Sequence, residues 1–299
     1  MVIRLKKISL FSFQTLSTIH ILTRAAMSTY KERGVMFLTD VVPRSNLELL
    51  KTFDIRDDDI MLITYPKAGT WWLHQVVKQI LAAQGVKDEK YLGNIPNLIA
   101  STVPGKGPLA ELFKTAPSPR VLATHVPVEF LPDGLLGSKA KIVVLMRNPK
   151  DTTVSMFHFS HKVPKLPTPE SWDSFVQQFL TGDCPCGPFY DHVLGYWKLK
   201  DQPNILFLKY EDMKKDLPAE VKKLCSFLEK PLSDEEVQAV VGATQFDSMK
   251  KTLGERGQRN TRKGVIGDWK NYFSDDQSRA YDEQYRERLS NTGLEFQFE

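Results

Sequence analysis

IMLITYPKAGTWWLHQVVKQILAA, residues 60–83, reads as a strand, a short loop and a helix in that order. Residues 60–65 form a short, mainly apolar run that ends at Pro66, as expected for a short buried strand. From residue 70 to about residue 83, apolar side chains recur at helical spacing, namely Trp72, Val76, Val77 and Ile80. A strand that leads through a tight loop into a helix is the repeating unit of a parallel α/β sheet, so this segment predicts that architecture.

Similar patterns follow along the rest of the chain. The additional strand-like runs are residues 120–124, 141–146 and 205–210. Helical patterns begin at Pro149 and Glu211, and others cover residues 219–228, 233–241 and 275–289. Two stretches rich in glycine, proline or basic residues are expected to be loops, residues 102–108 and 251–267. The alternation predicts a single α/β domain over residues 31–299, with a central, mainly parallel sheet flanked by helices.

The composition argues against several classes of protein. Of the 299 residues, 41% are hydrophobic and 25% are charged, which is ordinary for a globular domain. The formal net charge of +4 is too small to indicate a nucleic-acid-binding protein, but it suits a cleft for an acidic ligand. The cysteines form no disulfide framework and lack zinc-site spacing; they are Cys184, Cys186 and Cys225. We therefore expect no metal, no nucleic-acid partner and a cytoplasmic location.

The N-terminal segment differs from the rest of the chain. Residues 1–31 contain no Asp or Glu, several basic residues and many Ser and Thr. This composition is typical of a mitochondrial transit peptide, but it also fits an extension upstream of an alternative start at Met27. We expect residues 1–30 to be a disordered extension, with mitochondrial targeting as the alternative. No apolar run reaches the ~18 residues that a membrane-spanning helix needs, so no membrane span is expected.

The loop at residues 64–70 has the features of an anion site. A helix N-terminus offers unpaired N–H groups and a partial positive charge. Gly69 permits close backbone approach, Thr70 offers a hydroxyl and Lys67 adds a full charge. The loop is shorter than a Walker A loop and its lysine precedes the glycine, which argues against an ATPase that binds Mg²⁺ through the loop hydroxyl. The alternative is a plain strand–turn–helix connection.

Two further basic segments follow other predicted elements. Arg147 ends a buried strand, where ligands of open α/β sheets bind, and Ser155 lies a little over two turns into the next helix. Arginine suits bidentate phosphate contacts, although a surface salt bridge to Asp151 is the alternative role. Arg262, Lys263 and Gly264 form a basic, glycine-containing loop that could fold over an anion. The alternative for this loop is a solvated charged segment.

His125 lies at the end of the strand over residues 120–124. A histidine there could act as a general base because its pKa lies near physiological pH. A lone histidine is more often structural, so His125 by itself does not establish catalysis.

These four segments together resemble those of the cytosolic sulfotransferases, in order and at similar spacing, from about residue 36 to the C-terminus. The detailed pattern is most similar to a divergent vertebrate-type branch, the family-six B group. The resemblance implies a P-loop-like strand–loop–helix that binds 3'-phosphoadenosine 5'-phosphosulfate (PAPS), a donor with two anionic ends, and it implies no metal.

The resemblance also implies residue roles. The 5'-phosphosulfate would be held by the donor loop, Lys67, Ala68, Gly69, Thr70, Trp71 and Trp72. The 3'-phosphate would be held by Arg147, Ser155, Arg262, Lys263 and Gly264. The adenine would be surrounded by Trp72, Tyr210, Thr244 and Phe246. His125 would remove the acceptor proton and Lys67 would stabilise the leaving oxygen. An apolar wall for the acceptor is expected from Phe157 and Phe159.

The chain departs from the family pattern at four places. Trp71 stands where the donor loop often has a second Thr, Ala123 where many members have Lys, and Asn260 where an aromatic is usual. The C-terminal dimerisation motif is degraded, since the stretch starting at Lys270 lacks its Thr-Val pair and has Arg279 in place of Glu. We therefore expect weaker donor contacts and a monomer.

The implied activity is transfer of a sulfonate group to a hydroxyl or amine of a small-molecule acceptor. A phenol is the default acceptor, iodothyronine-like phenols are included, and steroids and amines stay open. Two other hypotheses remain at this point. One is a non-catalytic relative that binds the nucleotide, and the other is a nucleotide kinase, which the missing Walker A loop disfavours.

Overall fold

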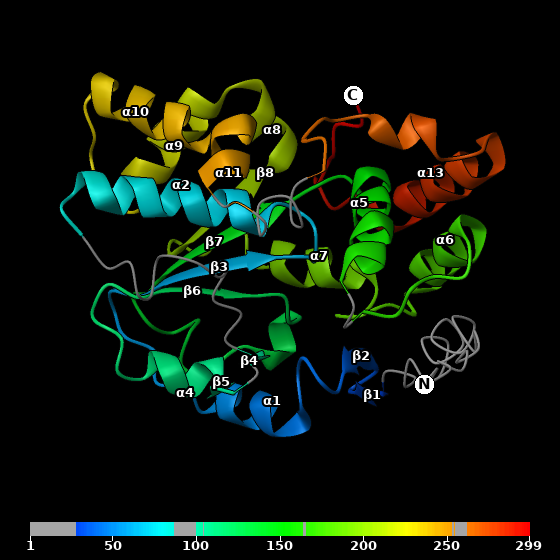
Figure 1. The fold of residues 1–299 in the computed structure, drawn as a ribbon, viewed down its shortest axis with the longest axis horizontal. Coiled ribbons are helices and arrows are strands. Elements are labelled where there is room, and N and C mark those ends of the chain that lie inside the picture. The colour runs from blue at the N-terminus through cyan, green and yellow to red at the C-terminus, as the bar shows by residue number, and fades with distance from the viewer. Residues whose placement is uncertain (1–27, 87–99, 104, 164–165, 253, 255–261) are drawn as a thin grey trace, which may run out of the picture.

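The computed structural model describes residues 28–86, 100–103, 105–163, 166–252, 254 and 262–299. Within these ranges a four-stranded sheet lies between helices that cover both of its faces (Figure 1). The predicted extension at residues 1–30 falls almost entirely outside the described ranges, and the first described element already begins at Thr29. No helix in the described ranges combines the length and apolar character needed to cross a membrane.

The central sheet is parallel throughout, which confirms the predicted fold class. It consists of β3 (Ile60–Thr64), β6 (Val121–Thr124), β7 (Lys141–Met146) and β8 (Ile205–Lys209), in the spatial order β6-β3-β7-β8. After β3 the chain first forms a strand on one side of it and then crosses to the other side. Ligands of such sheets bind at the carboxyl edge where the strand order reverses, which here is the end of β3.

Alternate residues of β3 pack into two separate cores. Ile60 and Leu62 contact helices α2 (Thr70–Ala83), α9 (Leu217–Phe227) and α10 (Asp234–Thr244). Met61 and Ile63 belong to the core on the other face, which includes α1 (Arg44–Lys51), α4 (Leu109–Phe113) and α7 (Phe189–Trp197). Because side chains alternate across a strand and both faces are covered, β3 must be apolar at every position.

The remaining helices gather near the carboxyl edge of the sheet. They are α5 (Pro149–Lys162), α6 (Trp172–Thr181) and α13 (Asp275–Leu289) (Figure 1). Asn148 caps α5 by accepting from the Asp151 N–H, with Pro149 in the first turn. The shorter elements are β1 (Thr29–Glu32), β2 (Val35–Leu38), β4 (Thr102–Val103), β5 (Gly107–Pro108), η2 (Val128–Phe130), α8 (Tyr210–Lys215), α11 (Phe246–Thr252) and η3 (Asp268–Asn271).

Several local expectations need correction. The loop predicted at residues 102–108 contains the paired strands β4 and β5. The helix predicted from residue 219 begins at Leu217, because Asp216 caps it by accepting from the Ala219 N–H. The hairpin β1–β2 and the helices α1, α6 and α7 were not predicted, although α6 carries a local signal in the capping box of Ser171 and Ser174.

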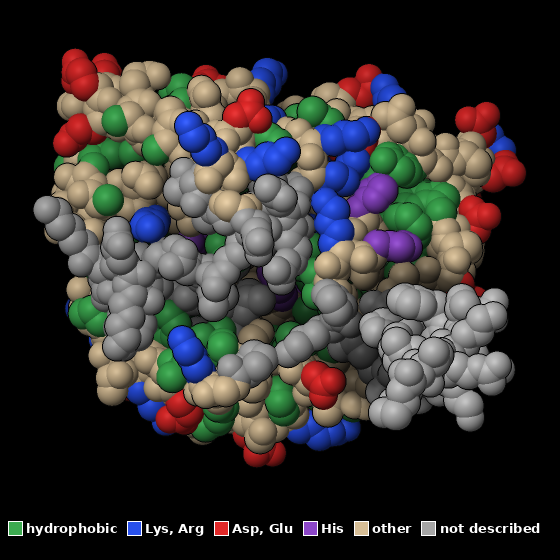
Figure 2. Space-filling view, in the orientation of Figure 1, with side chains coloured by type: hydrophobic (Ala, Val, Ile, Leu, Met, Phe, Trp, Pro, Cys, Tyr) green, Lys and Arg blue, Asp and Glu red, His purple; other side chains and the backbone are tan. Residues whose placement is uncertain are grey.

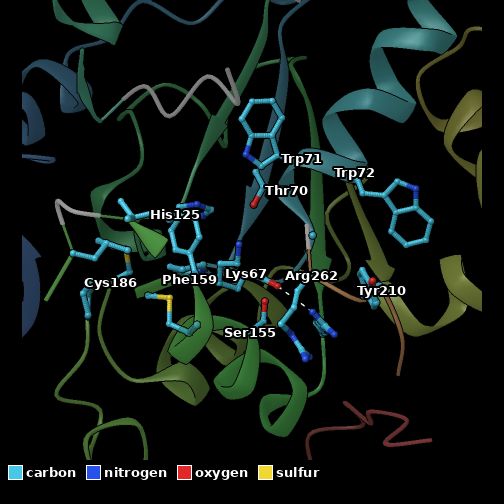
Figure 3. Close-up of a pocket in the computed structure, with 18 of the residues that line it drawn as sticks. Lys67, Thr70, Trp71, Trp72, His125, Ser155, Phe159, Cys186, Tyr210 and Arg262 are labelled. Atoms are coloured by element: carbon cyan, nitrogen blue, oxygen red, sulfur yellow. Dashed lines mark hydrogen bonds between the residues drawn. The ribbon is translucent and has the colours of Figure 1, made fainter. Parts of the chain in front are cut away.

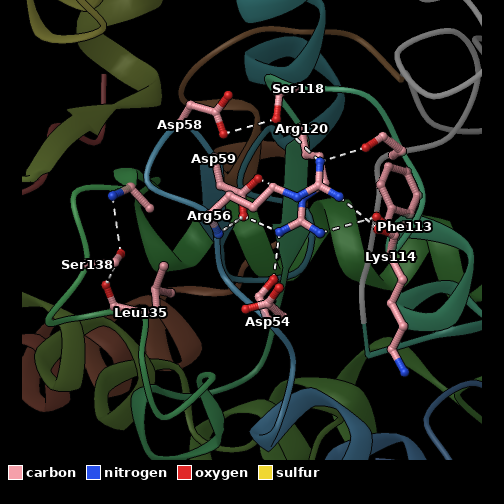
Figure 4. A network of polar contacts seen from close by, with 12 residues as sticks. Asp54, Arg56, Asp58, Asp59, Phe113, Lys114, Ser118, Arg120, Leu135 and Ser138 are labelled. Atoms are coloured by element: carbon pink, nitrogen blue, oxygen red, sulfur yellow. Dashed lines mark hydrogen bonds and ion pairs between the residues drawn. The ribbon is translucent and has the colours of Figure 1, made fainter.

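A buried ion pair lies at the amino ends of β3 and β6, opposite the ligand edge (Figure 4). Arg120 donates from Nε to an Asp59 carboxylate oxygen at 2.7 Å, and a second guanidinium nitrogen pairs with the other oxygen. Both side chains are almost fully buried. The remaining guanidinium contacts go to the carbonyls of Asp54 and Phe113. Such a pair persists in the core because its hydrogen-bonding groups are satisfied, and it ties the two strands that carry Thr64 and His125.

Candidate functional site

A cavity of about 490 Å³ opens at the carboxyl edge of the sheet. Figure 2 shows one face of the molecule, on which basic side chains gather in the upper middle and most acidic side chains lie toward the margins. The residues predicted to form the site and found on the cavity wall are Lys67, Gly69, Thr70, Trp71, Trp72, His125, Arg147, Ser155, Phe159, Tyr210, Phe246, Arg262, Lys263 and Gly264. Three predicted residues lie behind the wall, namely Ala68, Thr244 and Phe157.

The donor loop curls tightly before α2 begins. Lys67 and Gly69 have positive φ angles of 71° and 116°. A Cβ on Gly69 would come within 2.9 Å of the Tyr210 ring, so this position requires glycine. No side chain caps α2, so the N–H groups of its first turn are available to an anion. Ala68 is fully buried and its own N–H donates to the Tyr65 carbonyl at 3.1 Å, which turns this residue away from the cavity.

Arg147 is held over the Tyr210 ring rather than in a surface salt bridge. Its guanidinium carbon lies 4.3 Å from the ring centroid, and its terminal nitrogens donate to the carbonyls of Lys67 at 3.4 Å and Val265 at 3.3 Å. The alternative partner, Asp151, instead accepts from the backbone N–H groups of Gly267 and Trp269, at 2.9 and 3.1 Å. Arg147 is therefore a largely buried cation on the cavity wall, with long, weak contacts to neutral acceptors.

The basic segment at residues 262–264 folds against Asp268. Arg262 forms an ion pair with this carboxylate, and Lys263 approaches its other oxygen at 2.8 Å. Two cations thus share one buried carboxylate, which leaves one net positive charge at the cavity edge. Gly264 has a φ of 67°, and a Cβ there would meet the Phe246 ring at 2.4 Å. Asn260, the predicted departure in this region, lies outside the described residues.

We expect Gly264→Ala to weaken binding of adenosine 3',5'-bisphosphate by about tenfold, or 1.4 kcal/mol. The new methyl group must displace the Phe246 ring from the cavity wall. Gly293→Ala is the matched control, because Gly293 has a φ of 71° but no atom within 4 Å of its Cβ position. Both variants carry the same backbone strain, so equal affinities by isothermal titration calorimetry would contradict the predicted steric effect.

An aromatic group forms the wall farther along α2. The Trp72 and Tyr210 rings meet edge to face at 5.2 Å. The Trp72 indole N–H donates to the Thr244 carbonyl at 2.9 Å, while the buried Thr244 hydroxyl donates to the Val240 carbonyl at 2.7 Å. Thr244 therefore orients the indole from behind. An indole so held can stack on a base without losing its own hydrogen bond.

His125 is held through one ring nitrogen. Its Nδ1 lies 2.7 Å from the carbonyl oxygen and 3.1 Å from the hydroxyl of Thr64. A carbonyl oxygen can only accept, so Nδ1 carries the proton and Nε2 keeps its lone pair. Burial lowers the pKa of His125 to about 4, and Lys67 adds to this effect. The imidazole is therefore neutral at physiological pH, in the tautomer that a general base needs.

Lys67 lies between the two halves of the cavity. Its ammonium nitrogen is 3.8 Å from the centroid of the Phe159 ring. Burial, with the nearby Arg147, Lys162 and Arg262, lowers the pKa of Lys67 to about 7. Figure 3 shows Lys67 and Phe159 at the centre, with Trp72, Tyr210 and Arg262 on one side, Cys186 on the other and Ser155 below Lys67. The Thr64 hydroxyl, 2.6 Å from that of Thr70, links His125 to the donor loop.

The side of the cavity beyond Lys67 is mostly apolar. Phe159 is the member of this wall that was predicted as an acceptor-contacting residue, and its other members include Leu38, Val41, Pro66, Thr102, Met156, Val163, Leu166, Pro185 and Cys186. Phe157 instead packs against Trp172 and Phe175, at ring distances of 5.2 and 5.6 Å. Residues two apart on a helix point about 200° away from each other, so Phe157 and Phe159 cannot share a wall. Ala123 is fully buried in β6 and adds no side chain to the cavity.

The described residues contain no group of three or more metal-ligating side chains with the geometry of a metal site. Cys184 and Cys186 are both free thiols, and the Cys184 sulfur lies 3.1 Å from the Tyr65 hydroxyl.

Comparison with known proteins places this site in a family. The model of the sulfotransferase domain matches residues 57–293. The chain is 40% identical to sulfotransferase 6B1 of Danio rerio over 89% of this chain and 90% of that protein. It is 37% identical to an amine sulfotransferase of Oryctolagus cuniculus over 88% of this chain and 91% of that protein. A crystal structure of mouse sulfotransferase SULT7A1 complexed with PAP matches with a TM-score of 0.78 and 36% identity, covering 88% of this chain and 94% of that chain. The chain belongs to the cytosolic sulfotransferase family, within its 6B branch, and is a PAPS-dependent enzyme.

Proposed function

We propose that the chain transfers the sulfonate group of PAPS to a hydroxyl or amine of a small molecule, with His125 as the general base. The observation that carries this proposal is the 2.7 Å contact between His125 Nδ1 and the Thr64 carbonyl. It leaves Nε2 as the basic atom, in a cavity that also contains Lys67 and the N-terminus of α2. A base, a cation and a set of backbone donors are what an in-line group transfer needs.

In the proposed step, the acceptor oxygen or nitrogen attacks the sulfur while the bond from sulfur to the bridging oxygen breaks. The acceptor proton moves to His125 Nε2. The negative charge that develops on the leaving phosphate oxygen is stabilised by Lys67 and the first-turn N–H groups of α2. The products are the sulfated acceptor and adenosine 3',5'-bisphosphate, and the imidazolium returns its proton to solvent. A phenol has an unperturbed pKa of about 10, so a base assists its attack at neutral pH.

The donor is proposed to lie with its two anionic ends at separate basic sites. The 5'-phosphosulfate fits the donor loop, and the 3'-phosphate fits Arg147, Ser155 and the segment at residues 262–264. Trp72, Tyr210 and Phe246 would then contact the adenine. This arrangement is supported by the shared cavity wall and by the uncapped start of α2.

The acceptor is proposed to be an apolar or aromatic molecule that is neutral or positively charged. The wall beyond Lys67 is mostly apolar, and Asp40 is the one carboxylate that the described residues contribute to the cavity. A carboxylate on the cavity wall favours acceptors that carry an ammonium group. The name of one relative, an amine sulfotransferase, agrees with this class.

We expect Asp40→Asn to raise the KM for tyramine about 1.4- to fivefold, because an exposed ion pair contributes ~0.2–1 kcal/mol. The KM for 4-ethylphenol, which has the same phenol but no ammonium group, should not change. Initial rates with both acceptors at saturating PAPS give the comparison. A parallel rise in both KM values would show that Asp40 acts on cavity shape and not through its charge.

The reaction class is tested by incubating the protein with sulfur-labelled PAPS and a panel of phenols, steroids and amines. We expect label to appear in at least one acceptor. Tight binding of adenosine 3',5'-bisphosphate without transfer to any acceptor would instead favour a non-catalytic, nucleotide-binding role.

A further inference from the structure

Two side chains of α7 hydrogen-bond the backbone that carries His125. His192 Nε2 lies 3.1 Å from the carbonyl oxygen of His125. The Tyr196 hydroxyl donates to the next carbonyl, that of Val126, at 2.7 Å. His192 and Tyr196 are one helical turn apart and therefore lie on the same face of α7. Two consecutive peptide groups after β6 are thus held by one rigid helix.

The Nε2–H group of His192 donates the hydrogen bond that holds the His125 carbonyl. A carbonyl oxygen can only accept, so His192 must carry its proton on Nε2. The side chain is buried and Nδ1 has no hydrogen-bond partner within the described part of the chain. A buried nitrogen without a partner is unfavourable, and an apolar side chain of similar size would avoid that penalty. The hydrogen bond to the His125 carbonyl is the compensating interaction that the structure offers.

The same helix also contacts the end of β3. The centroid of the His192 ring lies 5.3 Å from that of Tyr65 and 5.1 Å from that of Tyr196. Tyr65 directly follows Thr64, whose carbonyl holds the His125 side chain. His192 therefore packs against the residue that follows Thr64 and donates to the backbone of His125, so its removal affects the surroundings of both residues.

We propose that His192 and Tyr196 are positioning residues for sulfonate transfer, which fix the direction in which His125 Nε2 points. This inference rests on the proposed role of His125 as the base. Neither side chain lines the cavity, so neither contacts the donor or the acceptor. Their effect is on alignment, and a displacement of about 1 Å at a reacting group can reduce a rate about 100-fold.

The test compares His192→Leu with His192→Gln, whose amide nitrogen can take the place of Nε2. We expect His192→Leu to lower kcat about 10- to 100-fold, with the KM for PAPS and the affinity for adenosine 3',5'-bisphosphate within about twofold of wild type. His192→Gln should recover most of the lost kcat. Tyr196→Phe, which removes only a hydroxyl, should lower kcat in the same direction and serves if His192→Leu does not fold.

Two controls separate positioning from general stability. His74→Leu removes another fully buried histidine, on α2, and should leave kcat within about twofold at temperatures well below the unfolding midpoint. His192→Leu should have almost no further effect in a His125→Ala background, because the base that it positions is already absent. A purely structural role would lower activity equally in both backgrounds.

These experiments distinguish failure of the positioning role from failure of the proposed function. If His125→Ala retains full transfer, His125 is not the base and the proposed function loses its central residue. If His125→Ala is inactive while folded His192→Leu and Tyr196→Phe both keep wild-type kcat, only the positioning role is overturned.

Discussion

Replacing His125 with alanine is expected to lower kcat about 10²- to 10⁴-fold, which is the usual contribution of a general base. The loss should appear in kcat, because the acceptor proton moves only as the new bond to sulfur forms. Affinity for adenosine 3',5'-bisphosphate should stay within about twofold of wild type, since this side chain is hydrogen-bonded to Thr64 and not to the basic segments. Single-turnover transfer of label and isothermal titration calorimetry measure the two quantities separately.

His125→Asn and His161→Ala sharpen this experiment. An asparagine amide can still donate to the Thr64 carbonyl but has no basic nitrogen, so it should be as inactive as alanine. His161 is exposed on α5, where its Nδ1 hydrogen-bonds the Phe157 carbonyl, so its removal should leave kcat within about twofold of wild type. Substantial activity in His125→Asn would show that orientation of the loop matters and that proton removal does not.

The second large effect is expected at Lys67. Lys67→Met keeps the length of the side chain but removes its charge, and should lower kcat about 10²- to 10³-fold, as loss of one donor to a developing anion does. Product affinity should fall about tenfold, or ~1.5 kcal/mol. Lys67→Arg retains the charge and should recover part of both. Unchanged kcat in Lys67→Met would exclude a role at the leaving oxygen.

The lowered pKa of Lys67 adds a pH dependence to this prediction. In the ligand-free site its pKa is about 7, and a bound dianion stabilises the ammonium form. Below pH 7 Lys67 is already charged; above pH 7 binding must take up a proton, so affinity should fall by up to about tenfold per pH unit. The phosphate groups are almost fully ionised above their second pKa of about 6, so titrations between pH 7 and 9 isolate the lysine. In Lys67→Met the affinity should be nearly constant over this range.

Local sequence patterns predicted the elements that depend on local packing. The predicted bounds agree with those of α2, β7 and α13, since each has an apolar period or a cap within its own segment. The capping box at Ser233 and Glu236 was also readable, because both partners lie within four residues. The donor loop was predicted from the helix N-terminus that follows a strand, and Arg147 and His125 were predicted from their places at the ends of strands.

Local sequence patterns did not predict the interactions between segments that are far apart in the chain. The wall beyond Lys67 combines residues 38, 41, 66, 102, 156, 159, 163, 166, 185 and 186, which carry no common motif. The orientation of Ala68 depends on a turn closed by the Tyr65 carbonyl, and that of Phe157 depends on the contact of α5 with α6. The expected monomer and the role of residues 1–30 stay predictions.

The anion-binding loop was thus contained in one segment of the sequence, and the parallel α/β class and the family were contained in the order and spacing of several segments. The protonation state of His125, by contrast, could not be inferred from the sequence. His125 is a neutral base with its lone pair on Nε2 only because the Thr64 carbonyl, 61 positions earlier, accepts from Nδ1. Its backbone is held by His192, 67 positions later. The order β6-β3-β7-β8 and the packing of α7 bring these groups together, and hydrogen bonds across such distances exist only after the chain has folded.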